Sequence, residues 1–527
     1  MQTTDQPAGQ SLISAWRWWL GPAALALVLA LIFVDPFVGD WDALDYTLLA
    51  LHGTPSSMAL GRTLFIFANH GLWRIAHALF HLPAEDAYLL FKYAVVLQSP
   101  LVIIACWALA RELTRSVQAS TVAALLISVS PIFIIYSGQV MTDVPSLLLL
   151  AVALVTYLRG VRKRSLWMML AGAALLGAGV NMRETVAFYA PWLLIAPLAC
   201  GWKPGGRDGI RIALSFLIFL IFALGPFAYL FIADVSNFRA SWYGWREAMR
   251  VEAARHPVTI RNVLPFMLYF FVTSPLVLVA LPVAALKEWR ARGLSPLLAL
   301  AAAGLFANLL LILNYSTTIN WRYFLTGLPA LTPLVADYLM RSQTARTGNV
   351  RRAFVSVLIA IVFIAIVFVI CIRPTSREYV KNRALTKDYR ARLALVPRDA
   401  VMISGAQTIA VNYWRGIDAG QWDTIGTGSG WPGAQLFSRI ESYLGEDRRV
   451  FLDADPRWWS PCGWQSEETR SLAGLEQHFR FRRISDTIYE IRPPHDETAQ
   501  DRPNLQRLLP EHRPEEVKKC AGVQSLS

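Results

Sequence analysis

The chain has 527 residues, is 55% hydrophobic and has a mean hydropathy of +0.39, which makes it more apolar than an ordinary soluble domain. Long uncharged runs carry the excess, so the composition excludes a soluble protein and indicates a polytopic membrane protein in contact with the lipid bilayer. The net charge of +13 does not indicate nucleic-acid binding, because much of the basic excess lies in short loops between apolar runs.

Eleven apolar runs are long enough to cross a bilayer as helices. Residues 1–15 before them are polar. Arg17 precedes the first run, and since no small-residue cleavage site follows, that run is predicted to be a signal anchor. The predicted spans are 18–38, 87–110, 119–136, 144–158, 166–180, 186–199, 210–232, 263–286, 294–313, 323–339 and 353–372.

The loop 39–85 after the first span contains two amphipathic stretches, 43–52 and 62–81. Their apolar residues recur at near-helical spacing between basic ones. This pattern predicts two helices that lie in the membrane interface, although 62–81 could instead span.

Basic residues fall in alternate loops, which fixes the orientation by the positive-inside bias. The N-terminus is then expected in the cytoplasm and the C-terminal part outside, in a cell inner membrane. The residues concerned are Arg111, Arg115, Arg159, Arg162, Lys163, Arg164, Lys203, Arg207, Arg211, Lys287, Arg290, Arg292, Arg341, Arg346, Arg351 and Arg352.

After Arg373-Pro374 the chain reads as an extracytoplasmic α/β domain. Short buried strands are predicted at 400–404, 449–453 and 487–491, and a helix at 433–444. The expected division is a transmembrane domain over 1–372, the α/β domain over 373–495 and a flexible tail over 496–527. The five cysteines show no metal-binding spacing, and a disulfide between Cys462 and Cys520 is one option.

Three carboxylates stand out at the expected outer edge of the membrane. Asp40 and Asp42 follow the first span, and Asp143 begins a later one. Ionised groups beside hydrocarbon are costly unless they are paired, hydrated or used. A carboxylate can deprotonate an acceptor hydroxyl or amine, whereas the plainer alternatives are a solvated loop and, for Asp143, a helix cap.

The same face carries cations and aromatic residues. Arg183 and Arg322 lie at helix ends, and Arg246 lies in an aromatic loop with Trp242 and Tyr243. Arginine can hold a phosphate and stabilise the charge that develops on it as it leaves. Aromatic faces suit a sugar ring, but Trp and Tyr at this depth are also typical belt residues.

In this order, these residues resemble the GT-C polytopic membrane glycosyltransferases, in particular the family-39-like protein O-mannosyltransferases and aminoarabinose transferases. The resemblance covers residues 18–372. It is carried by Asp42 four before Tyr46, by Tyr136-Ser137 ahead of Asp143, by Arg183 at the end of a helix pair, and by the run from Arg322-Tyr323 to Pro329.

The resemblance implies a mainly α fold and transfer of a sugar from a polyprenyl-phosphate donor to a lipid, glycan or protein acceptor on the outer face. It places the catalytic base on Asp42 or Asp40, the second acid on Asp143, and the phosphate contacts on Arg183 and Arg322. The sequence departs from many relatives, which have Asp-Glu where Asp42-Ala43 stands and Lys near position 183.

Two alternatives stay open: a transporter or flippase of a lipid-linked glycan, and a membrane scaffold with a sensory outer domain. A transporter typically shows an internal repeat or ionisable residues in mid-span, and neither is evident in the sequence. No cofactor is expected. The arginines favour a monophosphate donor without a metal, and a divalent ion between carboxylates is the alternative.

Overall fold

A computed structural model describes residues 16–34, 41–53, 62–203, 205–255, 274–314, 321–344, 369, 373–397, 399–407, 424–427, 433–459 and 470–517. The chain forms two compact units. Unit 1 contains Met1–Asp35, His52–Ile75 and Leu89–Tyr379, and unit 2 contains Pro36–Leu51, Ala76–Tyr88 and Val380–Ser527. The division expected at residues 372 and 495 stays a prediction, and parts of the loop 39–85 group with unit 2.

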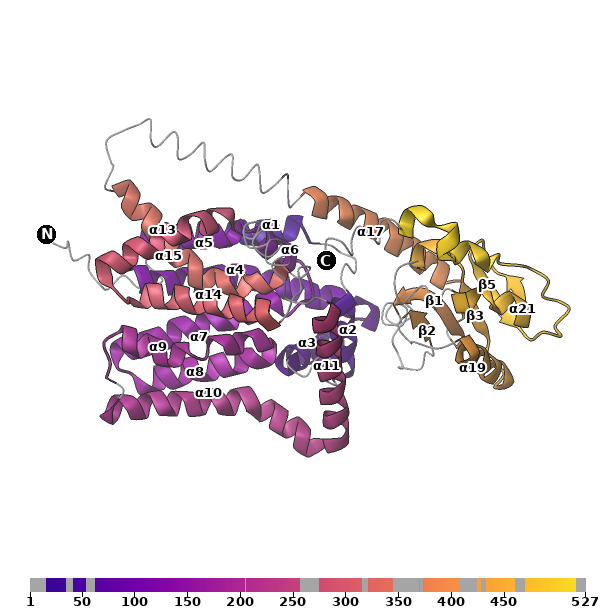
Figure 1. The fold of residues 1–527 in the computed structure, drawn as a ribbon, viewed down its shortest axis with the longest axis horizontal. Helices are drawn as coiled ribbons and strands as arrows, with labels where there is room; N and C mark the ends of the chain where they lie inside the picture. Colours follow the sequence, from indigo (N-terminus) through magenta and orange to yellow (C-terminus); the bar gives the residue numbers. More distant parts are fainter. Residues whose placement is uncertain are drawn as a thin grey trace. The chain divides into compact units, whose positions relative to one another are not determined.

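The elements described up to residue 344 are all helices (Figure 1). They are α1 (Trp16–Ile32), α2 (Trp41–His52), α3 (Thr63–Phe80), η2 (Ala84–Asp86), α4 (Ala87–Thr114), α5 (Val117–Ser128), α6 (Pro131–Ser137), α7 (Asp143–Lys163), α8 (Leu166–Met182), η3 (Glu184–Tyr189), α9 (Trp192–Ala199), α10 (Gly206–Ala233), α11 (Val235–Arg255), α13 (Pro275–Arg292), α14 (Pro296–Asn314), η4 (Trp321–Gly327) and α15 (Leu328–Thr344).

Among the described residues, α4, α7 and α10 are long and apolar enough to cross a membrane, and α5 with α6 makes a fourth candidate bent by 64°. Shorter apolar helices lie at Arg17–Ile32, Leu166–Met182, Glu184–Ala199 and Pro296–Leu309. The expected span 353–372 lies outside the described residues apart from Val369, as does the first part of 263–286. The polytopic helical fold is confirmed.

Three predicted spans are broken, and one of them, 323–339, is the 3₁₀ segment η4 followed by α15. The run 119–136 divides into α5 and α6 because Pro131, at the start of α6, has no N–H to continue the α5 ladder. The run 186–199 is the 3₁₀ segment η3 followed by α9, with Pro191 at the junction. Apolar length alone does not reveal such breaks.

Glycines let α7, α8 and α10 pack side by side (Figure 1). A Cβ at Gly172 of α8 would lie 2.6 Å from the backbone nitrogen of Tyr157 in α7. A Cβ at Gly177 would lie 2.5 Å from the carbonyl oxygen of Phe219 in α10. Small residues therefore bring the three backbones close together, as is common between membrane helices.

The aromatic loop expected around Trp242, Tyr243 and Arg246 is instead a helix, because α11 occupies Val235–Arg255 and leaves the direction of α10 (Figure 1). Arg250 and Glu247 form an ion pair of 2.6 Å one turn apart. The aromatic and basic residues of this segment therefore lie on a helix.

Unit 2 contains a five-stranded sheet in the order β2-β1-β3-β5-β4. Strands β1 (Val401–Gln407), β2 (Thr424–Thr427) and β3 (Val450–Asp453) are parallel, and β5 (Ile488–Arg492) is antiparallel to β3 and to β4 (Arg480–Arg483). The α/β prediction is confirmed, with β1, β3, β5 and α19 (Gly433–Gly445) close to their expected ranges. β2 and β4 were not predicted.

Helices cover both faces of this sheet. Val401 and Ile403 pack with Ile440 of α19, whereas the intervening Met402 packs with Tyr389 and Leu393 of α17 (Arg373–Leu393). Successive strand residues point to opposite faces, so both faces being buried explains the uninterrupted apolar runs in β1 and β3. The sequence did not indicate α17, because it is strongly charged and carries little apolar surface.

The tail expected over 496–527 is not flexible as far as residue 517, where the description ends. It contains η7 (Leu505–Leu508) and η8 (Pro510–His512), and Leu505 and Leu508 are fully buried in the core beneath α19. Hydrogen bonds from Arg507 to the carbonyl of Ala454 and from Arg513 to the carbonyl of Pro456 also hold this segment, whose Pro-rich, charged composition is typical of disorder. The Cys462–Cys520 pairing lies outside the described residues.

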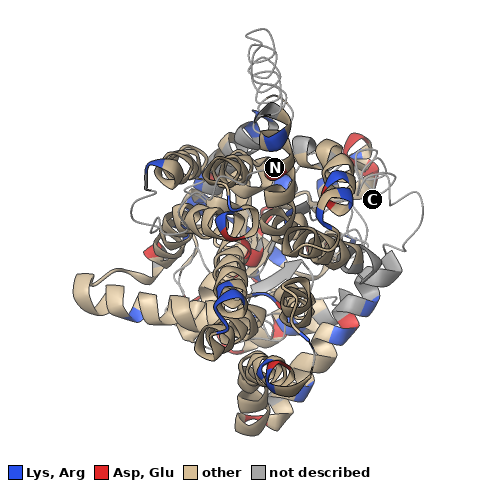
Figure 2. Cartoon of the chain, turned by 90° about the vertical axis from the view of Figure 1, so that its left-hand side faces the viewer, with Lys and Arg blue, Asp and Glu red and all other residues tan. Residues whose placement is uncertain are grey.

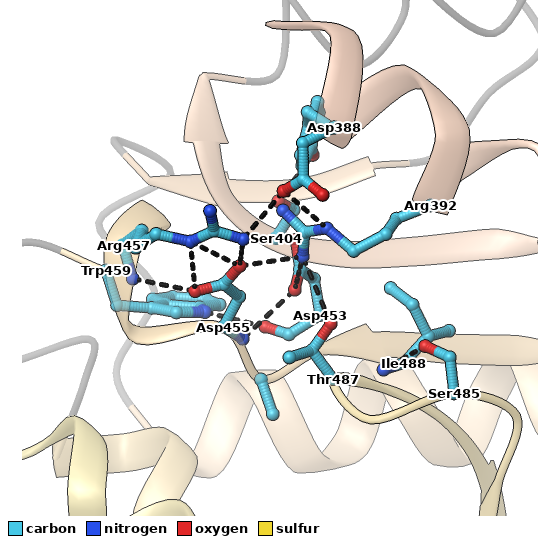
Figure 3. A network of polar contacts seen from close by, with 12 residues as sticks. Asp388, Arg392, Ser404, Asp453, Asp455, Arg457, Trp459, Ser485, Thr487 and Ile488 are labelled. Atoms are coloured by element: carbon cyan, nitrogen blue, oxygen red, sulfur yellow. Dashed lines mark hydrogen bonds and ion pairs between the residues drawn. The ribbon is translucent and has the colours of Figure 1, made fainter. Parts of the chain in front are cut away.

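A buried polar network joins α17 to the end of β3 (Figure 3). Nη1 of Arg392 lies 3.0 Å from Oδ1 of Asp453 and 3.0 Å from Oδ2 of Asp455. Arg457 contacts Asp455 and Asp388, each at 2.6 Å. We call these five residues the Arg392 network. Burial raises the pKa of Asp453 to about 7, whereas the pKa of Asp455 is lowered despite its own burial, by hydrogen bonds and charges from the two arginines.

Candidate functional site

The first carboxylate of the site is held at the start of α7. Thr142 is the N-cap and Asp143 the first helical residue, with 2% of its side chain exposed. Asp143 is therefore not the cap that the plainer interpretation suggested. A carboxylate at a helix N-terminus is favoured by the helix dipole, and burial requires that it also be paired.

Arg183 is the partner of Asp143. It follows α8 in extended backbone, is 1% exposed, and its Nη1 forms an ion pair with Oδ1 of Asp143. The same nitrogen lies 3.5 Å from the hydroxyl oxygen of Thr142. The sequence prediction that placed Asp143 and Arg183 on one face is thus supported by direct contact.

A second arginine joins them through one aromatic ring. The guanidinium of Arg183 lies 4.8 Å from the ring centroid of Tyr323, and that of Arg322 lies 5.7 Å from the same centroid. Both arginines are buried, and Nη1 of Arg322 also approaches the sulfur of Met141 at 3.9 Å. Asp143, Arg183, Arg322 and Tyr323 are called the Arg183 cluster below.

The Arg183 cluster contains buried hydrogen-bonding groups that have no hydrogen-bond partner in the described structure. Two guanidinium groups share one ring, and one carboxylate pairs directly with one of them. In the described structure Nε and Nη2 of Arg183 and Oδ2 of Asp143 are buried and make no hydrogen bond. Buried donors of this kind are normally satisfied, so the arrangement suits an anion with several acceptor oxygens.

Asn181 fixes the helix end that presents Arg183. It is 1% exposed, and its Nδ2 donates to the carbonyls of Phe222 and Ala223 in α10, at 2.8 and 3.2 Å. Pro226 has no N–H, so the Phe222 carbonyl lacks its partner within α10. Asn181 supplies that missing donor and thereby ties the last turn of α8 to α10.

The start of α3 is tied to the same helix end. The hydroxyl of Thr63 donates to Oδ1 of Asn181 at 3.4 Å, and Arg62 forms an ion pair with Glu184 at 3.5 Å. Arg183 therefore stands between two residues, Asn181 and Glu184, that are each held by other segments. A side chain supported in this way keeps a defined position.

The remaining predicted residues divide into three groups. Tyr136 is buried at the end of α6 in unit 1. Asp42, half-buried in the first turn of α2, and Tyr46, which is buried, belong to unit 2. Asp40 lies outside the described residues. Because α2 begins at Trp41, Asp42 lies within the helix and not at its cap.

Trp242, Tyr243 and Arg246 project from α11. Trp242 is 45% and Tyr243 64% exposed, and Arg246 is exposed as well. Among the described contacts, none joins these three side chains to Asp143, Arg183 or Arg322. Their assignment to donor binding stays a prediction, and their exposure also fits residues at the membrane interface.

Sequence reasoning missed Asn181, Glu184 and Lys92. Lys92 is fully buried in the second turn of α4, inside a predicted span. An ionisable residue within a span is a functional candidate by default, so the signal for Lys92 was present in the sequence. Asn181 gave no such signal, because its importance depends on a carbonyl that is distant in sequence. Among the described residues, no group of three or more His, Cys, Asp or Glu side chains is placed to hold a metal ion.

Comparisons with known proteins bear on the family and the fold of this chain. A family model described as dolichyl-phosphate-mannose-protein mannosyltransferase matches residues 72–229. A comparison with curated protein sequences found no match.

Two solved structures are similar over most of the chain. One is ArnT from Cupriavidus metallidurans bound to undecaprenyl phosphate, at 14% identity and a TM-score of 0.60, covering 93% of this chain and 100% of ArnT. The other is the archaeal oligosaccharyltransferase AglB from Archaeoglobus fulgidus with an inhibitory peptide and dolichol-phosphate, at 13% identity and a TM-score of 0.50, covering 91% of this chain and 74% of AglB. The chain therefore has the fold of the GT-C membrane glycosyltransferases.

Proposed function

We propose that the protein is a glycosyltransferase that moves a sugar from a polyprenyl-phosphate donor to an acceptor on the extracytoplasmic face of the membrane. The observation that carries this proposal is the Arg183 cluster, in which two buried arginines share one aromatic ring and guanidinium nitrogens of Arg183 make no hydrogen bond. A phosphate offers acceptor oxygens to Nε and Nη2 of Arg183, which are buried and make no hydrogen bond in the described structure. ArnT bound to undecaprenyl phosphate and AglB in complex with dolichol-phosphate lend support.

Each residue then has a role. Arg183 and Arg322 hold the donor phosphate and stabilise the charge that remains on it when the sugar leaves. Asp143 orients Arg183 through their ion pair. Asp42, with Asp40 as its rival, takes the proton from the acceptor. Neutralisation by two arginines favours a monophosphate donor without a metal ion.

The proposed orientation follows the basic loops. The N-terminus lies in the cytoplasm of a cell with an inner membrane, and the α/β domain lies outside. A C-terminal alkaline phosphatase fusion should then be active, and a cytoplasmic reporter at the same position should be inactive. The reverse result would place the domain in the cytoplasm and contradict the proposed face of reaction.

The decisive experiment combines donor turnover with the Asp42→Asn variant. Purified protein should hydrolyse or transfer the sugar of a radiolabelled polyprenyl-phosphate sugar. Asn is nearly isosteric with Asp but cannot accept the proton, so turnover should fall by about 10²–10⁴-fold with little change in donor binding. Asp40→Asn should have a smaller effect. If Asp42→Asn stays active and Asp40→Asn does not, Asp40 is the base.

A transporter or flippase is the second candidate, and the buried Lys92 is the feature that favours it. Proteoliposomes separate the two functions. A flippase moves the intact lipid-linked sugar between leaflets without breaking its glycosidic bond, whereas the enzyme releases polyprenyl phosphate. Movement of donor without cleavage would overturn the proposed enzyme.

A further inference from the structure

Two clusters of arginines and carboxylates lie at the opposite end of the unit 1 helices from Arg183. The Glu112 cluster joins the last turn of α4 to the last turns of α7, the helix that begins at Asp143. The Glu288 cluster joins α13 to the last turns of α15, which follows the segment containing Arg322. Figure 2 looks onto this end, where many Lys and Arg residues are visible.

The Glu112 cluster contains one carboxylate and three arginines. Oε1 of Glu112 accepts from Nε of Arg159 at 2.7 Å, and its Oε2 lies 3.3 Å from Nη1 of Arg162 and 3.9 Å from Nη1 of Arg115. The side chains of Arg159 and Arg162 are 26% and 20% exposed, so both reach the surface. The cluster therefore has a formal charge of +2.

The Glu288 cluster is balanced by comparison. Glu288 lies 3.4 Å from Arg292 and 3.9 Å from Arg341, and Arg341 also pairs with Asp337 at 2.6 Å. Two carboxylates thus face two arginines. Both clusters link neighbouring helices, so a structural requirement for ion pairs does not explain why only the Glu112 cluster keeps two uncompensated cations.

The surroundings place the Glu112 cluster at the level of lipid headgroups. Trp167, near the start of α8, is 80% exposed, and Arg164 and Arg211 lie over the ring of Trp202 at 5.5 and 5.9 Å. Exposed tryptophan and clustered arginine are typical of the membrane–water interface. At this depth the most abundant anion is a phospholipid phosphate, and basic pockets between membrane helices bind such headgroups.

We propose that the Glu112 cluster is a binding site for the phosphate of an anionic phospholipid in the leaflet at this end of the helices. The phosphate would approach the exposed sides of Arg115, Arg159 and Arg162 and neutralise the charge that Glu112 leaves over. This site is separate from the Arg183 cluster, and it does not depend on the proposed transferase activity.

Lipid retention tests the proposal with variants that act in opposite directions. The full-length protein is reconstituted in phosphatidylcholine nanodiscs that contain a minor fraction of phosphatidylglycerol, and the lipids retained after extraction are counted by native mass spectrometry. Arg159→Gln with Arg162→Gln should lower retention of phosphatidylglycerol by about fivefold for each arginine removed. Glu112→Gln should raise it, because one more positive charge becomes uncompensated.

Arg292→Gln in the balanced Glu288 cluster is the matched control and should leave retention unchanged. Circular dichroism checks that each variant is folded, and the opposite sign expected of Glu112→Gln keeps the test valid if the double variant is unstable. Equal retention in all variants would overturn the proposal. Free glycerol phosphate, added to the protein in phosphatidylcholine nanodiscs, gives a second comparison. If it raises the melting temperature as much as phosphatidylglycerol in the nanodisc does, the site selects a soluble anion and not a lipid, and the proposal is overturned.

Discussion

The Arg183 cluster and the Arg392 network are both built around buried arginines, yet their charges are balanced differently. In unit 2, two arginines meet three carboxylates, and Arg392 also donates to the hydroxyl of Thr487 at 3.1 Å. In unit 1, Arg183 and Arg322 share one ring, and only Asp143 pairs directly with Arg183. The first arrangement pairs each of its charges within unit 2, whereas the described ion pair of the second joins Arg183 to Asp143.

This difference distinguishes a structural network from a binding site. Burying charge is costly unless it is paired. In the Arg392 network each arginine and each carboxylate has an ion-pair partner within unit 2, although Nε and Nη2 of Arg392 and Oδ2 of Asp453 make no hydrogen bond. The Arg183 cluster also keeps buried donors without hydrogen bonds, and its described ion pair joins Arg183 to Asp143. We therefore use the pattern of described ion pairs, and not burial or unpaired donors alone, to infer where a ligand binds.

The largest effect is expected from Arg183→Ala, which leaves the Asp143 carboxylate buried without its partner. The free energy of unfolding should fall by about 3–5 kcal/mol. The free energy of binding undecaprenyl phosphate, measured by thermophoresis, should weaken by about 1.5–3 kcal/mol. Arg183→Lys should recover part of both, because it keeps the charge but loses the fork.

The exposed Arg250 on α11 provides the matched control for that variant, and Arg250→Ala should bind donor normally. If Arg183→Ala binds undecaprenyl phosphate as tightly as the unmodified protein, Arg183 serves only to pair with Asp143. Arg183 would then have no role in donor binding.

Arg392→Met should lower the free energy of unfolding of unit 2 by about 3 kcal/mol. This value is at the lower end of the range for breaking a buried ion pair, because Arg457 still contacts Asp455. Donor binding should not change, since the network lies in unit 2 and contains no residue assigned to the donor. Amide hydrogen exchange of β1 and β3 measures the first effect. A loss of donor affinity without loss of protection in these strands would contradict a purely structural role.

Asn181→Leu should have an intermediate effect, because it leaves the Phe222 carbonyl buried without a donor, at a cost of about 1–3 kcal/mol. Donor affinity should fall with stability, since the helix end that carries Arg183 is no longer held. Adding Pro226→Ala restores an N–H to the Phe222 carbonyl. The double variant should therefore regain stability without regaining donor affinity, with Pro226→Ala alone as its control.

The outcome of that pair sharpens the role of Asn181. Recovery of both properties in the double variant would mean that Asn181 matters only for the stability of α10. Recovery of stability alone would identify Asn181 as a positioning residue for Arg183.

The last prediction concerns the pH dependence of the free energy of unfolding, to which Asp453 contributes a small change per pH unit. Its pKa in the folded protein is about 7, raised by burial, against about 3.9 when unfolded. The folded state therefore binds the proton more tightly, so this group's contribution to stability is complete below about pH 4 and is lost as the pH rises toward 7. The slope cannot exceed about 1.4 kcal/mol per pH unit for one proton.

Asp453→Asn should remove that slope between pH 4 and 7. Hydrogen exchange in β3, corrected for the intrinsic rate at each pH, reports the change. Asp455 has a lowered pKa and affects stability only at more acidic pH, so Asp455→Asn serves as the contrasting variant. An unchanged slope in Asp453→Asn would show that Asp453 keeps its charge through its contact with Arg392.

Much of this protein was determined by local sequence. The apolar runs predicted the helices of unit 1, because length and hydropathy are properties of a single segment. The runs Val401-Met402-Ile403 and Val450-Phe451-Leu452 predicted strands that are buried on both faces. Asp143, Arg183, Arg322 and Tyr323 were identified as site residues because ionisable and aromatic groups at helix ends are conspicuous in an apolar chain.

Only the tertiary structure decided how those groups are paired. It brought Arg183 onto Asp143 across 40 residues and both arginines onto Tyr323, and it placed Asn181 on a carbonyl that Pro226 had freed. It also ordered α17, which the sequence did not indicate, and the segment with Leu505 and Leu508, whose composition indicated a flexible tail. The physical reason is the same in each case: a hydrogen bond, an ion pair or a buried face needs a partner that is distant in sequence, and local pattern carries no information about that partner.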